Sequence, residues 1–456
     1  MKLKVKVVIS IIFGLLFILT PIITDYHIYK SSINIDKNTN LKFSITWVPI
    51  HIDDTDPGLN WTVAKNDGIC TGNGTSSQPY VIKGLVIDGG NSGDCILIEN
   101  SDAHFIIQNC TVYNSTFYPY AAIRLINVEN ALLTGNNCSF NAWNGITLNK
   151  SHNNIIFGNN ASYNSNRGIF LYESENNSIW VNTATNNEYG IGLSSSSDNT
   201  NITGNFAFHN LYGIDVWSND NLILGNDLSD NYNYGISGGG DYNNITGNIL
   251  NCENYGINIQ YSHGNNIRGN VANYHREEGI RLYECNNNTV SGNTVNNNYG
   301  NGIRLHHGVN NILSENIASY NGIGGTGTHI NDFNGILLVY SNNNTVSGNT
   351  ANKNFRNGIR LASSGNNIIS GNNASYNGNA GISLYQSDYN TISGNELMRN
   401  GICIDDQGTG NVFENNNCSN GNGNDIAGPI PGYNIYILFS IFFVIAIVVR
   451  KKSKFE

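Results

Sequence analysis

A unit of about 22 to 23 residues recurs along most of this chain, and a Gly-Ile pair marks its phase. One clear copy runs from Asn343 to Leu361. A fixed period of this length indicates a solenoid, because each unit buries its apolar residues only against its neighbours. The glycine of the pair falls at Gly145, Gly168, Gly190, Gly213, Gly235, Gly256, Gly279, Gly302, Gly335, Gly358, Gly381 and Gly401.

Each unit holds two short apolar alternations bounded by Asn and Gly, a pattern typical of strands. Strong helix formers are scarce between them, which argues against leucine-rich repeats and Rossmann-type chains. Short strands with one turn of chain per period predict an all-β fold, a right-handed single-stranded parallel β-helix of about 14 coils. In each coil we expect residues such as Ile146 and Leu148 to point into the core.

Asn recurs at a turn of every unit. Asn tolerates left-handed backbone and hydrogen-bonds locally in turns. We therefore expect these amides to stack from coil to coil as an internal ladder that satisfies buried turn backbone. The residues expected to share one column are Asn154, Asn288, Asn311, Asn344 and Asn367.

This pattern, over roughly residues 80 to 420, resembles the parallel β-helix repeats of pectin-lyase-like proteins. It is closest to the NosD-type β-helices and the carbohydrate-binding and sugar-hydrolase β-helix domains. The resemblance implies the fold and leaves the activity open. The superfamily includes lyases, epimerases, glycosidases, phage tailspikes, copper-site accessory proteins and surface proteins.

The repeat divides the chain into four predicted parts. They are residues 1–24 as a signal peptide or signal anchor, 25–70 as an N-terminal cap region, 71–427 as the β-helix, and 428–456 as a C-terminal transmembrane anchor or sorting signal. A cap is expected because the first coil of a solenoid has no neighbour to cover it.

Both chain ends are apolar and have basic flanks. Lys2, Lys4 and Lys6 precede the apolar run of the N-terminus, as in secretory signals. The C-terminal tail resembles archaeal Pro-Gly-Phe surface-sorting tails, with Tyr433 in place of Phe. Basic flanks stay on the cytoplasmic side of the membrane, so we expect a membrane-anchored protein whose β-helix lies at the cell surface.

The body between these ends is strongly acidic. Without the seven basic residues and one acidic residue of the termini, 16 Lys and Arg remain against 32 Asp and Glu. A nucleic-acid partner needs a basic stripe, which this composition disfavours. Polysaccharides or cell-surface glycans are the partners we expect.

Eight cysteines in an exported chain predict disulfides. Four of them lie in the first coils, where the end of the core is open and cross-links would stabilise it: Cys70, Cys95, Cys110 and Cys138. Two later pairs are spaced for bonding between or within coils, Cys252 with Cys285 and Cys403 with Cys418. Sequons of the form Asn-x-Ser/Thr also recur, so we expect some surface glycosylation, though not on an amide inside the ladder.

The outward slots of the Gly-Ile-x-Leu strand carry candidate ligand-binding side chains. One slot holds Arg281, Arg304 and Arg360, and like charges on adjacent strands repel unless an anion or an acidic neighbour such as Glu278 or Glu284 pairs with them. Arginines that are solvated or ion-paired remain the alternative. The next slot carries aromatic residues that suit sugar rings or a half-exposed sheet: Tyr172, Trp217, Tyr283 and Tyr385.

An irregular step after Gly302 adds a Gly-rich segment to one coil. Insertions in solenoids form loops on one face, often the binding face. His306, His329 and Asp332 are therefore candidates to converge on a substrate or metal, with a solvated Gly loop as the alternative.

No complete enzyme motif is found. The run from Tyr212 to Asp215 resembles the opening of the alginate-epimerase motif, but Val216 and Trp217 replace its Pro and catalytic His. With two Met, the chain offers little for copper delivery. We predict no cofactor; a calcium loop in the acidic stretch from Asp53 lacks EF-hand spacing.

These observations favour a surface-anchored, non-catalytic β-helix protein with a glycan-binding or adhesive face. A polysaccharide lyase, epimerase or hydrolase of the pectin-lyase type is the second hypothesis. A structural envelope protein, or a NosD-type copper accessory protein, is the third.

Overall fold

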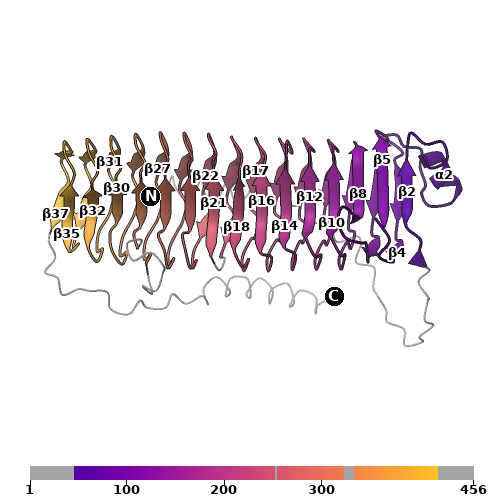
Figure 1. The fold of residues 1–456 in the computed structure, drawn as a ribbon, viewed down its shortest axis with the longest axis horizontal. Coiled ribbons are helices and arrows are strands. Elements are labelled where there is room, and N and C mark those ends of the chain that lie inside the picture. Colours follow the sequence, from indigo (N-terminus) through magenta and orange to yellow (C-terminus); the bar gives the residue numbers. More distant parts are fainter. Residues whose placement is uncertain (1–45, 252–253, 323–332, 420–456) are drawn as a thin grey trace, which may run out of the picture. The chain divides into compact units, whose positions relative to one another are not determined.

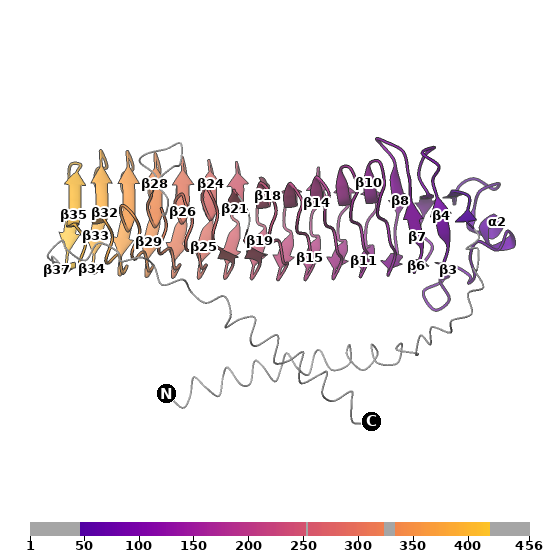
Figure 2. The ribbon, with the colours of Figure 1, turned by 90° about the horizontal axis from the view of Figure 1, so that it is seen from below.

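The computed structural model describes residues 46–251, 254–322 and 333–419, which wind into the expected parallel β-helix (Figure 1). Figure 2 shows strands of the long sheets repeating coil by coil along the stack. The predicted signal segment and C-terminal apolar segment lie outside the described residues. Within the described part of the chain, no helix is long and apolar enough to cross a membrane.

Sheet I contains 15 parallel strands, one from each coil, in chain order. In the first two thirds of the stack, most of these strands are six residues long. They are β2 (Ile50–Asp53), β5 (Ile96–Ser101), β8 (Ala121–Val128), β10 (Asn144–Asn149), β12 (Arg167–Tyr172), β14 (Tyr189–Ser194), β16 (Tyr212–Trp217), β18 (Tyr234–Gly239), β21 (Tyr255–Gln260), β24 (Ile280–Tyr283), β26 (Ile303–His306), β28 (Ile336–Val339), β30 (Ile359–Ala362), β32 (Ala380–Tyr385) and β35 (Ile402–Gln407).

Sheet II also has 15 parallel strands, and most of them have three residues. They are β3 (Tyr80–Lys83), β6 (Phe105–Gln108), β9 (Ala131–Thr134), β11 (Ile155–Phe157), β13 (Ser178–Trp180), β15 (Asn201–Thr203), β17 (Leu222–Leu224), β19 (Asn244–Thr246), β22 (Asn266–Arg268), β25 (Thr289–Ser291), β27 (Ile312–Ser314), β29 (Thr345–Ser347), β31 (Ile368–Ser370), β33 (Thr391–Ser393) and β36 (Val412–Glu414).

A third side closes each coil with short strands joined by single-residue bridges such as Asn137 to Asn160. Its strands are β1 (Thr46–Trp47), β4 (Val86–Asp88), β7 (Thr111–Tyr113), β20 (Ile249–Leu250), β23 (Val271–Ala272), β34 (Glu396–Met398) and β37 (Asn417–Ser419). All pairings within these three sides are parallel, so each side chain has a neighbour at the same position of the next coil.

The core is a set of inward columns with one apolar residue per coil on each side. Ile146 and Leu148 of sheet I are fully buried, as predicted, and so are Ile156 of sheet II and Ala161 of the third side. The period-two alternation of the strands therefore sets which residues face the core.

Buried asparagines form three internal ladders, of which the sequence analysis predicted one. In the predicted ladder, the backbone N–H of Asn288 donates to Oδ1 of Asn311 at 2.9 Å, and Nδ2 of Asn288 donates to the same atom at 3.0 Å. Asn344 and Asn367 continue it with the same geometry. The two other ladders follow sheet II and the third side, with members such as Asn293 and Asn298. The ladder amides hydrogen-bond to backbone N–H and C=O groups of the turns, which stacking of the coils buries away from water.

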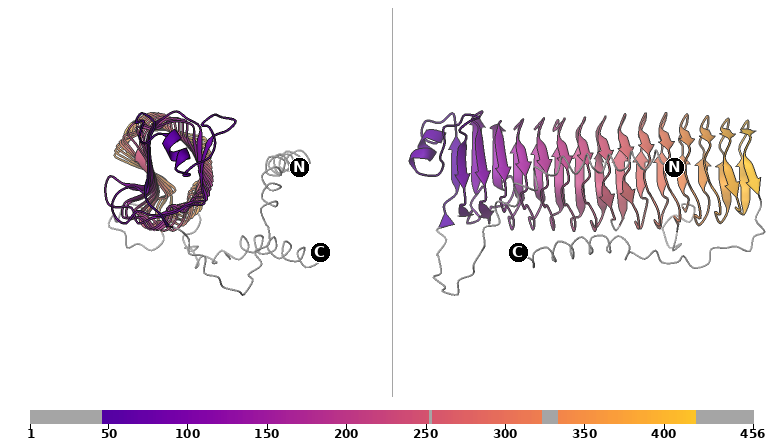
Figure 3. Two further views of the ribbon diagram at one scale, coloured as in Figure 1. Left: turned by 90° about the vertical axis from the view of Figure 1, so that its right-hand side faces the viewer. Right: turned by 180° about the vertical axis from the view of Figure 1, so that it is seen from behind.

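A helix, α2 (Trp61–Asn66), covers the first coil (Figure 3, left). Asn60 caps it by accepting hydrogen bonds from the N–H groups of Thr62 and Val63. Trp61 is buried and stacks on Tyr80 with ring centroids 4.7 Å apart. The cap is thus this helix, while β1 and β2, also within residues 25–70, already belong to the coils.

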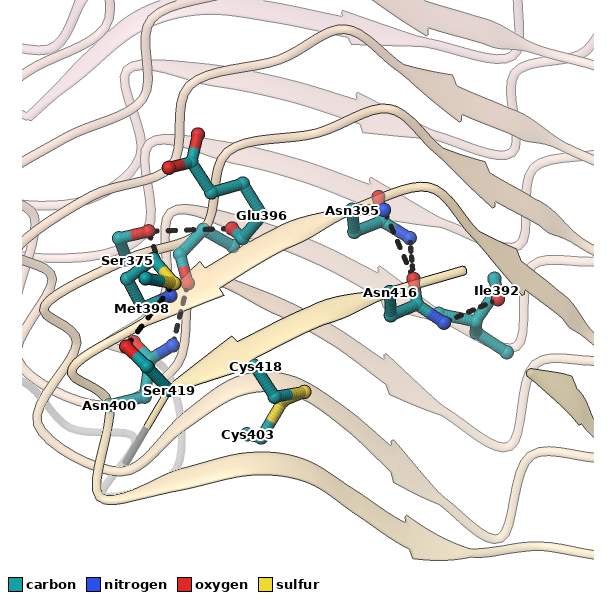
Figure 4. The surroundings of a disulfide bond; sticks show 11 residues. Ser375, Ile392, Asn395, Glu396, Met398, Asn400, Cys403, Asn416, Cys418 and Ser419 are labelled. Atoms are coloured by element: carbon teal, nitrogen blue, oxygen red, sulfur yellow. Dashed lines mark hydrogen bonds between the residues drawn. A yellow bond between two sulfur atoms is a disulfide. The ribbon is translucent and has the colours of Figure 1, made fainter. Parts of the chain in front are cut away.

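The last coil is closed by a disulfide between Cys403 of β35 and Cys418 of β37 (Figure 4), one of the pairings expected from spacing. Asp406 of β35 pairs with Leu384 of β32 and occupies the last position of that inward apolar column. Its carboxylate accepts hydrogen bonds from Gly408 N and from Asn411 Nδ2, the second at 2.8 Å. A carboxylate at an otherwise apolar position discourages further stacking.

The expected disulfides among the N-terminal cysteines are wrong, because Cys70, Cys95, Cys110, Cys138 and Cys285 are free and buried. They act as small apolar core residues. Cys138, for example, occupies the inward column that Ala161 continues in the next coil. Cys252 lies outside the described residues.

Candidate functional site

The outer face of sheet I carries three files of side chains, and each file takes one residue from each coil. The first file, at the strand starts, includes Arg167, Tyr189, Tyr212, Tyr234 and Tyr255. The second is Phe170, Gly192, Asp215, Ser237, Asn258, Arg281, Arg304, Leu337 and Arg360. The third includes Tyr172, Ser194, Trp217 and Gly239, and then Gln260, Tyr283, His306, Val339, Ala362 and Tyr385.

The first file is a stack of four tyrosines that the sequence analysis did not single out as a site. Ring centroids from Tyr189 through Tyr212 and Tyr234 to Tyr255 are 4.6, 5.4 and 5.2 Å apart, with interplanar angles below 20°. Burial, reinforced by Glu278, raises the pKa of Tyr255 to about 12. Because the ring faces stack against one another, a ligand could contact the hydroxyl edges of these tyrosines but could not stack on their faces.

Arg167 closes one end of the tyrosine stack. Its guanidinium lies 4.2 Å from the ring centroid of Phe170 and 4.7 Å from that of Tyr189. Gly192 makes room for it, since a Cβ there would lie 3.1 Å from Arg167 Nε. Burial lowers the pKa of Arg167. This arginine therefore makes cation–π contacts with two aromatic rings.

Asp215 is the carboxylate at the middle of the face. It accepts hydrogen bonds from Ser237 Oγ at 2.6 Å and from Trp217 Nε1 at 3.2 Å. Burial raises the pKa of Asp215, and these two hydrogen bonds oppose the rise. The sequence analysis set the run from Tyr212 to Asp215 aside because it lacks the catalytic His of the motif. The signal that it passed over is that Asp215 is the first acid at this outward position, and the next is Asp405.

Trp217 provides an exposed aromatic platform beside Asp215. Its side chain is 49% exposed, and its ring lies against Gly239 of the next coil, where a Cβ would lie 2.9 Å from the indole. In the same file, Tyr172 and Tyr385 are also exposed. The register thus aligns the predicted aromatic candidates along the stack, several coils apart.

The predicted arginines lie toward the C-terminal half of the second file. Arg281 and Arg304 are on adjacent strands, and Arg304 Nη1 lies 3.1 Å from Oε1 of the buried Glu278. This ion pair was one of the expected alternatives. Arg281 lies over the rings of Tyr255 and Tyr283, at 5.8 and 5.5 Å from their centroids.

The Nε atom of Arg281 is buried and finds no hydrogen-bond acceptor among the described residues. Arg360 is separated from this pair by the buried Leu337 and lies 5.5 Å from the ring centroid of Tyr385. In the adjacent pair, Arg304 is therefore neutralised by Glu278, whereas no ion pair to a described acid neutralises Arg281. The buried Nε atoms of Arg124 and Arg167 on the same sheet also lack an acceptor among the described residues, so the missing ion pair is what sets Arg281 apart from Arg304.

Glu278 also ends a chain of amides at the strand starts of sheet I, most of them buried, that the sequence analysis missed. Asn379, Asn357 and Asn334 donate in turn to the next amide at 3.0, 2.8 and 3.0 Å, and Asn301 then donates to Glu278 at 3.4 Å. All four Nδ2 groups point along the stack toward the carboxylate. Three of these asparagines, Asn301, Asn334 and Asn357, lie immediately before a marker glycine in the sequence.

His306 belongs to an aromatic cluster at the edge of the face. Its ring centroid lies 5.2 Å from that of Tyr283, 4.4 Å from that of His307 and 5.9 Å from that of Tyr340. Burial, followed by the nearby Arg304, lowers the pKa of His306 to about 4. Its two proposed partners, His329 and Asp332, lie outside the described residues.

The described ranges contain no group of three or more His, Cys, Asp or Glu side chains arranged to hold a metal ion. Met398, the methionine of the β-helix, accepts a hydrogen bond from Ser419 Oγ at its sulfur (Figure 4). The thiol of Cys138 is fully enclosed, and burial raises its pKa, which disfavours the thiolate that binds metals.

Two family descriptions match the chain. Residues 67–228 match a right-handed β-helix region, and residues 194–323 and 327–432 match NosD, described as a periplasmic copper-binding protein. The second match spans more than half of the 456 residues. The donor set just described does not fit a copper site within the part of the chain that the structure covers.

Several solved structures are similar to this chain. A mutant of the periplasmic alginate epimerase AlgG is 17% identical, with 80% of this chain and 91% of that chain covered and a TM-score of 0.43. The Dettilon tailspike protein is 16% identical over 80% and 68% of the two chains, with a TM-score of 0.41. The A-module of Azotobacter vinelandii mannuronan C-5 epimerase AlgE4 is 13% identical over 78% and 86%, with a TM-score of 0.38. No curated protein matches the chain.

Proposed function

The chain belongs to the NosD family of β-helix proteins, and from that premise we propose that the outer face of sheet I binds an extended anionic polysaccharide outside the cytoplasm. The protein acts as an anchored binding or adhesive protein of the cell surface. The single observation that carries this proposal is the unmet donor of Arg281 beside the neutralised Arg304. A carboxylate on a sugar would supply the missing acceptor.

The arrangement of the files supports a polymer rather than a single sugar. The arginines and exposed aromatic rings run parallel to the stack in adjacent files, from Tyr172 to Tyr385. Successive coils repeat at about 4.8 Å. A chain lying along this axis would place carboxylates against Arg281 and sugar faces against Trp217, while the tyrosine hydroxyls offer hydrogen bonds to its edge.

Because the rest of the protein is acidic, a polyanion should bind only at the file of arginines on sheet I. The chain carries 33 acidic and 23 basic residues, and Arg281, Arg304 and Arg360 lie in one file of a single face. A polyanion would be repelled from most of the surface and attracted there. Such attraction weakens as salt screens it.

A titration of the full-length protein with polygalacturonate and with its methyl ester tests the proposal. The ester keeps the backbone and removes the carboxylate charge. We expect tighter binding of the acid form, weakened by added NaCl, and loss of that preference in Arg281→Gln. Equal affinity for the two polymers, or binding of neither, would overturn the proposal.

Asp215 favours a second candidate function, a polysaccharide-cleaving or epimerising enzyme. A partly buried carboxyl group with a raised pKa beside an exposed indole ring is suited to act as a proton donor. The test is release of new reducing ends or unsaturated products from polyuronate by the wild-type protein and by Asp215→Asn. Activity that Asp215→Asn abolishes would establish this function; turnover by neither protein would exclude it for that substrate.

A further inference from the structure

We propose that five Asn-x-Ser/Thr sequons on the outer face of sheet II and its leading corner carry N-linked glycans. The acceptor atoms are the side-chain Nδ2 atoms of Asn176, Asn201, Asn244, Asn287 and Asn343. The modification is the attachment of an oligosaccharide, and it is independent of ligand binding at sheet I. Its argument rests on exposure, hydrogen bonding and position.

Three of the sequons lie at the corner before a sheet II strand and begin with two asparagines. Asn176, Asn287 and Asn343 come first in each pair, have φ of 57°, and are exposed. The second residue of each pair, such as Asn288, is buried in the internal ladder. The corner thus turns the sequon asparagine outward and its neighbour inward.

The other two sequons lie within strands. Asn201 and Asn244 are the first residues of β15 and β19 and are exposed. The next residue of each strand, Ile202 or Ile245, points into the core and is fully buried. Strand alternation therefore places the sequon Asn and its Thr together on the outer face.

The amide nitrogens of these five residues are available. None of the five Nδ2 atoms donates a hydrogen bond to any described residue. Two other sequons differ in this respect: Nδ2 of Asn114 donates to Asp88 at 2.7 Å, and Nδ2 of Asn73 donates to Gln78 at 2.7 Å. These two amides are already engaged.

The sequon at Asn149 provides a contrast because it lies on sheet I. It ends β10 of sheet I, and its Oδ1 is buried without a partner. A glycan here would stand beside the proposed ligand files, whereas the five proposed sites belong to sheet II. The proposed glycans therefore coat one side of the β-helix and leave the outer face of sheet I open.

The reaction needs a lipid phosphate-linked or diphosphate-linked oligosaccharide donor and a membrane oligosaccharyltransferase. A bond forms between Nδ2 and the anomeric carbon of the first sugar as the bond from that carbon to the phosphate oxygen breaks. The amide nitrogen loses one proton, and the lipid phosphate or diphosphate is the leaving group. No redox change occurs.

Peptide mass spectrometry of the full chain, isolated from the organism that encodes it, tests the proposal. We expect glycopeptides at the five proposed sites and unmodified peptides at Asn73, Asn114 and Asn149. Unmodified asparagine at all five sites, or equal occupancy at the three contrast sites, would overturn it.

A matched pair of variants separates sequon recognition from folding. Thr289 lies on the outer face of β25, so neither Thr289→Ser nor Thr289→Ala disturbs the core. Thr289→Ser should keep the glycan on Asn287 and Thr289→Ala should lose it, with the other four sites unchanged. Retention of the glycan in Thr289→Ala would contradict sequon-directed transfer.

Discussion

The outer faces of sheets I and II cover the same core and come from the same repeat, yet they carry different chemistry. The second file of sheet I includes Asp215, Arg281 and Arg304, partly buried among aromatic rings. The corresponding face of sheet II is dominated by short hydroxyl and amide side chains, as in Thr289 and Ser291 of β25. A stacked repeat therefore constrains inward residues strictly and leaves outward ones free to diverge.

Strand length contributes to the difference. A six-residue strand such as β16 presents three outward files, while a three-residue strand such as β15 presents two positions around one inward residue. The longer strands can hold a carboxylate, an aromatic platform and an arginine side by side. Sheet I is therefore the face on which a polymer can make several kinds of contact at once.

The largest effect is expected from the ladder that supports both faces. Nδ2 of Asn293 donates to Ile267 O at 2.9 Å, and its Oδ1 accepts from the backbone N–H of Asn270 at 2.9 Å. Asn293→Ala leaves these buried groups unmet, so we expect the free energy of unfolding to fall by about 3 kcal/mol or more. The exposed Asn201→Ala should change it by less than about 0.5 kcal/mol in denaturant titrations. Equal costs would mean that the ladders do not stabilise the fold.

Arginine substitutions test whether the two faces differ in ligand binding. Arg281→Gln removes charge-assisted hydrogen bonds worth about 1.5–3 kcal/mol, so the Kd for polygalacturonate should rise by about 10- to 100-fold. The control is Arg268→Gln on the exposed outer face of β22, which should change the Kd by less than about twofold. Similar losses in both variants would point to general attraction of the polyanion rather than to one binding face.

Tryptophan substitutions provide a second matched pair. Trp217 of sheet I and Trp180 of sheet II are 49% and 40% exposed, but only Trp217 lies beside the arginine file. Trp217→Ala should weaken polysaccharide binding by about 3- to 10-fold, because aromatic stacking contributes about 0.5–1.5 kcal/mol. Trp180→Ala should leave affinity unchanged in the same titration. Loss of affinity only in Trp180→Ala would move the binding face to sheet II.

The smallest expected effect concerns pH and the edge of sheet I. His306 has a folded-state pKa of about 4, against 6.5 in the unfolded chain. The unfolded state thus binds more protons between these values, and the stabilisation present above pH 6.5 is lost as pH falls toward 4. His306→Gln should reduce the difference between unfolding midpoints at pH 7 and pH 5, while the exposed His263→Gln should not. An unchanged difference in His306→Gln would show that the half-buried imidazole has no such role.

Much of the fold was predictable because the period defines neighbours. The Gly-Ile pair and the alternation around Ile146 and Leu148 predicted parallel coils and inward columns, and the structure has both. One Asn column was also predicted correctly. The other two ladders, with Asn293 and Asn298, were missed because a single sequence shows that Asn is frequent without showing which turn buries it.

The candidate site was predicted only in part. Counting by period placed Arg281 next to Arg304 and aligned Trp217 with Tyr172. It left open whether an anion, Glu278 or Glu284 would pair with these arginines, because the contact between Glu278 and Arg304 joins residues 26 positions apart in different files. The cysteines show the same limit, since Cys138 fills an apolar column where spacing suggested a cross-link.

The sequence by itself determined the architecture, because a periodic pattern of inward apolar residues has one efficient way to be buried, coil upon coil. Only the tertiary structure decided the chemistry of the surface. Steps between ladder asparagines vary, from 21 residues between Asn205 and Asn226 to 33 between Asn316 and Asn349, so register between coils is fixed by ladder hydrogen bonds rather than by counting. Side-chain pairing across coils then decides that Arg304, rather than its neighbour Arg281, forms the ion pair with Glu278.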